Sequence, residues 1–128
     1  MTEQQKTIAQ LMEEHAITGK VRLFSRAPSR PLTKEMIMWI GTFHAHGETL
    51  KIPHATSDIT PPTPQKVLWT ILLEVEQLDR GFDEWANENG FDPESSTAKR
   101  AHKKILAYEE QLKSFLGEPY TDFLSAIL

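Results

Sequence analysis

The stretch that most limits how this chain can fold is residues 82–117, where glycine and proline divide a run of helix-spaced apolar side chains into two helices. Phe82 and Trp85 lie at helical spacing, and Gly90 stands where a left-handed residue commonly ends a helix. Pro93 then fits the first position of a second helix, which the apolar spacing extends to the glycine at 117. The segment therefore predicts a helical layer against which the rest of the chain packs.

A β-hairpin is predicted upstream of these helices. Residues 36–45 and 48–53 each alternate between the two faces of a strand, and a glycine separates them. Because glycine accepts the positive φ of a two-residue hairpin turn, we expect a register in which Phe43 faces Leu50. That face should meet the helices, whereas the opposite face is partly apolar and is either covered by the first helix or free for a partner. This opposite face carries Met38, Ile40, His44, Thr49 and Lys51.

The remaining segments complete an α+β prediction. A helix is expected over residues 2–15, with a capping box at Thr2, and a short strand over residues 20–25. Another helix should begin at Pro64 and continue to about residue 79. We thus predict a single domain, 1–128, in which a small antiparallel sheet, a hairpin plus a short strand, packs against a C-terminal helical bundle.

Composition excludes several classes of function. The 128 residues include no cysteine, which removes thiolate catalysis and cysteine zinc sites and suits a reducing cytoplasm. No apolar run approaches the ~20 residues of a membrane span. The net charge of −4 argues against general binding to duplex DNA, which usually requires a strongly basic surface.

An acidic segment is the leading candidate for a partner-binding surface. Six carboxylates fall between residues 79 and 94, and only Arg80 opposes them. Their spacing is not that of a calcium loop, and two of the positions are helix starts, where acids are expected anyway. As a surface, the segment could face a basic partner such as a nucleic-acid-binding groove. The six are Asp79, Asp83, Glu84, Glu88, Asp92 and Glu94.

Three histidines offer an alternative reading as a metal-binding module or metal-dependent enzyme. His44 and His46 have the spacing that puts two imidazoles on one face of a strand, and His54 lies near the end of the next strand. Against this, His46 sits at the proposed turn, where strand alternation does not set its direction. Surface or partner-contact histidines are the competing interpretation.

Basic residues offer a third reading, a nucleic-acid-binding accessory protein. Arg26 and Arg30 lie in a proline-rich loop, which is either an anion or partner contact or a solvated connector. A second group on the long helix flanks its apolar stripe, is followed by acidic residues, and fits a solvated helix face as well as a phosphate contact. That group is Lys99, Arg100, Lys103 and Lys104. No nucleophile-elbow context surrounds Ser57, Ser95 or Ser96, so serine hydrolysis is not supported. We find no catalytic constellation elsewhere in the sequence and expect no enzyme and no cofactor.

The string GFDEWANENGFDPESS resembles a recurrent pattern in small proteins of bacteriophages and other mobile elements. In that pattern an aromatic pair precedes Glu-x-Gly-Tyr/Phe-Asp-x-Asp/Glu-Ser, and a helix ending in Leu-Gly follows. A Pro-Thr pair before a helix and a two-stranded segment lie upstream, so the resemblance covers residues 36–117 and leaves 1–35 as a variable N-terminal part. This chain departs in having Thr97 and Ala98 where a basic residue often occurs, and in lacking the cysteines of some members. Matched positions are Phe82, Trp85, Glu88, Gly90, Phe91, Asp92, Glu94 and Ser95.

The resemblance implies a function by association. Small accessory proteins of phages often act stoichiometrically on host machinery, and anti-CRISPR and other defence inhibitors are one such class. We therefore expect a protein of the host cytoplasm that binds and inhibits a host complex, with no membrane contact and no small-molecule ligand, while a homo-oligomer stays open. The expected partner-binding residues are Asp79, Asp83, Glu84, Glu88, Arg26 and Arg30.

Overall fold

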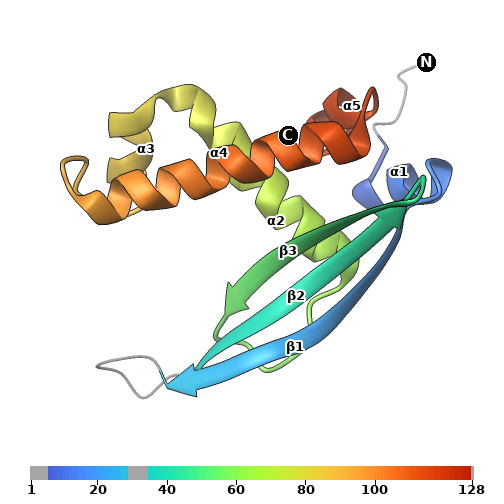
Figure 1. Ribbon diagram of the computed structural model, residues 1–128, viewed down its shortest axis with the longest axis horizontal. Coiled ribbons are helices and arrows are strands. Elements are labelled where there is room, and N and C mark those ends of the chain that lie inside the picture. Colours follow the sequence, from blue (N-terminus) through green and yellow to red (C-terminus); the bar gives the residue numbers. More distant parts are fainter. Residues whose placement is uncertain (1–5, 29–34, 128) are drawn as a thin grey trace. The chain divides into compact units, whose positions relative to one another are not determined.

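The computed structural model describes residues 6–28 and 35–127, and the side chains of residues 26–28, 35 and 36 are left out of the description. The chain divides into two compact units, Met1–Thr70 and Ile71–Leu128. We call them the sheet unit and the helical unit (Figure 1). Helix α2, Pro64–Glu76, contains the division.

The sheet unit begins with helix α1, Ile8–Glu14, which is closed by a capping box. The Thr7 hydroxyl accepts a hydrogen bond from the Gln10 backbone N–H, and the Gln10 side chain accepts one from the Thr7 N–H. The predicted box at Thr2 lies outside the described residues, and the described helix begins at Ile8 instead. Burial of Ile8, Leu11 and Met12 anchors this helix.

Three antiparallel strands follow in the order β1-β2-β3. They are β1, Thr18–Pro28, β2, Glu35–Ala45, and β3, Glu48–Thr56. The predicted hairpin register is confirmed, since Phe43 pairs with Leu50 and Ala45 with Glu48. His46 and Gly47 occupy the turn with φ of 52° and 77°, as a turn with positive φ at both central residues requires.

The two faces of the sheet differ sharply in burial. On the inner face Ile37, Trp39, Phe43, Leu50 and Ile52 are all buried. Helix α2 lies against this face, because a Cβ built on Gly41 would come within 2.8 Å of a Val67 side-chain carbon. On the outer face the alternate residues are half-buried or exposed, so the first helix does not cover it.

The helical unit holds the end of α2 and four further helical segments. They are the 3-10 turn η1, Gln77–Arg80, and helices α3, Phe82–Glu88, α4, Ser96–Leu116, and α5, Tyr120–Ala126. Helix α4 begins three residues after the predicted Pro93. Ser95 is its N-cap and accepts a hydrogen bond from the Ala98 N–H, while Asp92 instead closes the preceding turn by accepting from the Glu94 N–H.

An aromatic cluster joins α3 to α4. Trp85 is 1% exposed, and its ring stacks on Phe91 at a centroid distance of 5.7 Å. Phe91 is brought back by the glycine stop, since its N–H donates to the Ala86 carbonyl at 2.8 Å while Gly90 has a φ of 77°. The His102 ring of α4 meets Trp85 edge-on at 5.0 Å.

The predicted α+β class, with a small antiparallel sheet and a C-terminal set of helices, is confirmed. The single-domain assignment stays a prediction.

Candidate interaction surfaces

The acidic surface consists of exposed carboxylates around α3, namely Asp79, Asp83, Glu84, Glu88, Asp92 and Glu94. Its geometry follows from the aromatic cluster. Because Phe82, Trp85 and Ala86 turn inward, the intervening residues Asp83 and Glu84 must turn outward. All four acidic residues predicted for partner binding therefore lie on the surface of one unit.

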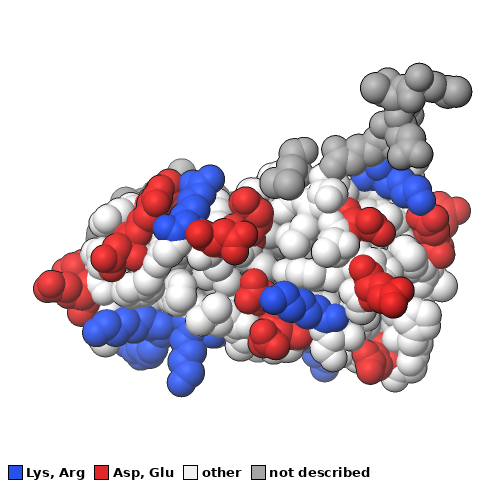
Figure 2. All heavy atoms as spheres, turned by 90° about the horizontal axis from the view of Figure 1, so that it is seen from above, with Lys and Arg blue, Asp and Glu red and all other residues white. Residues whose placement is uncertain are grey.

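Few basic side chains offset the negative charge of the acidic surface. Among the described residues, one ion pair involves it, from Arg80 to Glu88 across the ends of η1 and α3. Residues 79–94 hold six carboxylates against one arginine and carry −5, so the rest of the chain carries +1 of the total −4. At the left of Figure 2, one group of basic side chains lies along the lower edge, and other basic atoms lie among the acidic side chains above it.

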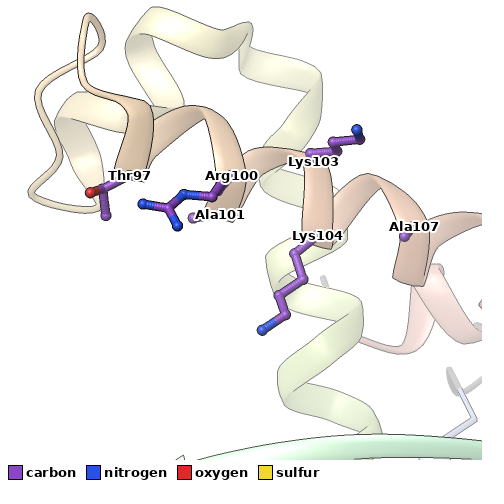
Figure 3. A pocket seen from close by; sticks show the side chains of 6 residues that line it. All are labelled: Thr97, Arg100, Ala101, Lys103, Lys104 and Ala107. Atoms are coloured by element: carbon purple, nitrogen blue, oxygen red, sulfur yellow. The ribbon is translucent and has the colours of Figure 1, made fainter.

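A basic stripe runs along α4. Lys99, Arg100, Lys103 and Lys104 are exposed, and none is ion-paired with a described residue. An open hollow on this helix is lined by Thr97, Arg100, Ala101, Lys103, Lys104 and Ala107. Figure 3 shows the long side chains of Arg100, Lys103 and Lys104 pointing away from one another. The stripe therefore offers separate charges in place of a convergent anion site.

The three histidines do not come together. His44 lies on the outer face, where its Nδ1 is 3.0 Å from the Thr49 hydroxyl, and His46 is in the turn. His54 pairs with Trp39 and so belongs to the inner face. Desolvation, followed by the charge of Lys66, lowers the pKa of His54. No group of three or more potential ligands among the described residues could hold a metal ion, so the three-histidine site is wrong.

The outer face of the sheet includes residues of β1 that the sequence analysis did not assign to it. Met38 and Ile40 of β2 are half-buried at its centre. β1 adds Lys20 and Arg22 on one side, because they pair with Thr42 and Ile40, and β3 adds Lys51 on the other. All three cations are exposed and none is ion-paired with a described residue. None of the outer-face positions in the described part of the sheet is a carboxylate.

A bulge interrupts the alternation of β1 after Leu23. Strict alternation along the predicted strand, residues 20–25, would place Arg22 and Phe24 on one side, but the register shifts between Leu23 and Ser25. Phe24 is the extra residue there, and its side chain is 67% exposed. A bulge leaves no alternation signal that could show it in advance. Arg26 lies in β1, where it pairs with Ile37, so its predicted place in a loop is wrong. The side chains of Arg26 and Arg30 lie outside the described residues, and their predicted partner contact stays a prediction.

Two buried indole N–H groups have no acceptor, those of Trp39 and Trp85. Each lies within an apolar cluster in its own unit, and neither lines the hollow on α4. None of the helices in the described parts of the chain has the length and apolarity to cross a membrane.

Comparison with protein-family models, with curated proteins and with solved structures finds no match to this chain.

Proposed function

We propose that this protein is a non-catalytic, phage- or mobile-element-encoded protein that binds and inhibits a host defence complex through its acidic surface. The observation that carries the proposal is the concentration of charge at residues 79–94, which hold −5 while the rest of the chain holds +1. The resemblance of the GFDEWANENGFDPESS string to phage proteins supports a host complex as the partner.

The physical basis is electrostatic complementarity. The carboxylates lie on short elements that the buried Trp85 and Ala86 hold in place, so they form a fixed array. At physiological salt, charges screen over about 8 Å, and neighbouring carboxylates therefore act together on an approaching cation. A basic groove that binds nucleic acid presents the matching potential, and its occupation by this surface would exclude the nucleic acid.

The direct test is capture and inhibition with a charge-reversed variant. Wild-type protein is mixed with purified nucleic-acid-guided defence complexes, and their cleavage activity is titrated. We expect inhibition to be complete near one equivalent, and the double variant Asp83→Lys/Glu84→Lys to lose both capture and inhibition. The matched control is Glu13→Lys/Glu48→Lys, which makes the same change of net charge at two exposed positions of the sheet unit.

Retained inhibition by the α3 variant would refute the acidic surface as the docking site. Inhibition at amounts far below one equivalent would refute a stoichiometric mode of action and point to an enzyme.

The unpaired cations of α4 favour a second candidate, binding to nucleic acid. This alternative predicts a mobility shift of DNA or RNA at low salt that weakens steeply as salt rises. The absence of any shift at low salt would remove it.

A further inference from the structure

We propose that the outer face of the sheet is a second docking site, and that it binds an amphipathic helix with acidic flanks on a partner protein. This site is distinct from the acidic surface and takes a partner of the opposite charge. It rests on the register of the three strands and on the burial of their side chains, all within the sheet unit.

The first observation is an apolar centre on a face that solvent should contact. An antiparallel sheet covered on one side usually carries polar residues on the other. Here β2 places Met38 and Ile40 at the middle of the outer face, and β3 adds Pro53 beside Ile40. All three are half-buried. No described element of the sheet unit covers them, since Arg22, which pairs with Ile40, and Ser25 and Ala55, which pair with Met38, are exposed.

The second observation is the placement of the cations. Arg22 of β1 pairs with Ile40, while Lys20 of β1 and Lys51 of β3 lie one row further along, so positive charge lies on both edge strands at one end of the apolar centre. Lys20 and Lys51 stand in one row, because both pair with Thr42. Two strand spacings of about 4.8 Å separate β1 from β3 by roughly 10 Å, which matches the width of one α-helix.

These dimensions favour a helix over other occupants. A helix lying along β2 would set an apolar stripe on Met38 and Ile40, while carboxylates on its two flanks reach Lys20 and Lys51. Single-stranded nucleic acid, by contrast, binds sheets through aromatic side chains on which bases stack. The described outer-face positions that pair between the strands hold no aromatic ring apart from the exposed His44, and the exposed Phe24 at the bulge of β1 is a single ring that offers no row on which successive bases could stack.

The test is selection of helical peptides by the full-length protein. The library holds peptides of about four turns with leucines fixed along one stripe. Their flanking positions vary among glutamate, glutamine and lysine, so that selection itself reports the charge preference. We expect glutamate-flanked peptides, whose affinity falls by about tenfold or more for Lys20→Glu/Lys51→Glu and for Met38→Ser/Ile40→Ser. Because Lys20 and Lys51 are exposed, their substitution should leave the sheet folded. The lysine variant therefore still tests the site if Met38→Ser/Ile40→Ser fails to fold.

Matched controls separate this site from the others. Lys99→Glu/Lys103→Glu makes the same charge change on α4 and should leave peptide affinity unaltered. Asp83→Lys/Glu84→Lys should also bind the peptide normally, so failure of the acidic-surface proposal leaves this result intact.

Three outcomes would overturn the proposal. They are selected peptides with lysine flanks, selected peptides indifferent to the Lys20 and Lys51 reversal, and no selected helix at all. A single-stranded oligonucleotide could also displace the peptide. If it binds more tightly than the peptide and depends on the same lysines, the face would be assigned to nucleic acid instead.

Discussion

The acidic surface and the outer face of the sheet differ in where their apolar and charged side chains lie. Around α3 the apolar side chains face the interior, where Trp85 is 1% exposed, and carboxylates occupy the solvent-facing side. On the outer face Met38 and Ile40 remain half-buried under nothing described in their unit, and cations border them. The first surface is therefore suited to electrostatic docking alone, and the second to docking with apolar burial. The contrast predicts stronger salt dependence for the first.

The largest expected effect comes from truncating Trp85, the buried side chain of the helix that carries the acidic surface. Trp85→Ala leaves a cavity in the aromatic cluster and should lower the free energy of unfolding by about 3–5 kcal/mol. Trp85→Phe keeps an aromatic ring and deletes an indole N–H that has no acceptor, so it should lose much less. Urea denaturation of both variants measures the difference. Equal losses would show that ring volume does not hold this surface.

The two faces of the sheet should respond unequally to small changes in side-chain size. Gly41→Ala sets a Cβ 2.8 Å from the buried Val67 on the inner face, and overpacking of this kind costs about 1–3 kcal/mol. Thr42→Ala, one residue away on the outer face, should change stability by less than about 1 kcal/mol. Chemical denaturation compares the two. A larger loss for Thr42→Ala would mean that the outer face is packed.

The field of the acidic surface should be felt at Tyr120. Burial first, and then the charges of Glu109 and Asp79, raise the pKa of Tyr120 to about 12. Since the unfolded phenol titrates near 10, the unfolded state loses its proton first, and stability should fall as pH rises from about 10 toward 12. Spectrophotometric titration measures the pKa directly. Asp79→Asn should lower the Tyr120 pKa, and an unchanged value would show that the field does not reach it.

The smallest expected effect is a pH dependence on the inner face. The pKa of His54 is lowered by desolvation and by Lys66. As pH falls, the folded imidazole therefore takes up its proton at a lower pH than the unfolded one, whose pKa is near 6.5. This contribution to stability is present above pH 6.5 and is lost as pH falls below it. Denaturation between pH 5 and 7 should show a shallower slope for His54→Gln, and an identical slope would contradict the assignment.

Local chemistry made much of this fold predictable. The turn at His46 and Gly47 and the glycine stop at Gly90 both follow from positive φ, a property that can be read from the residues alone. The start of α4 was misplaced because Asp92 can cap a helix or close a turn, and the Ser95 cap decides between them. Pairing of distant strands is a long-range property, so the contribution of β1 to the outer face could not be predicted.

The candidate sites divide in the same way. Exposure of Asp83 and Glu84 followed from helical periodicity around Trp85, because burying one stripe of a short helix exposes the other. The histidine site failed because spacing along the chain says little about which face a residue occupies across a turn. His54 falls on the inner face through its pairing with Trp39, whereas His44 lies on the outer face.

The most direct measurement is the hydrogen-exchange footprint of this protein when it is bound to an inhibited host complex. The account predicts slowed exchange in residues 79–94, with the footprint lost when Asp83 and Glu84 are reversed to lysine. A bound complex that leaves this segment exchanging as in the free protein would contradict it.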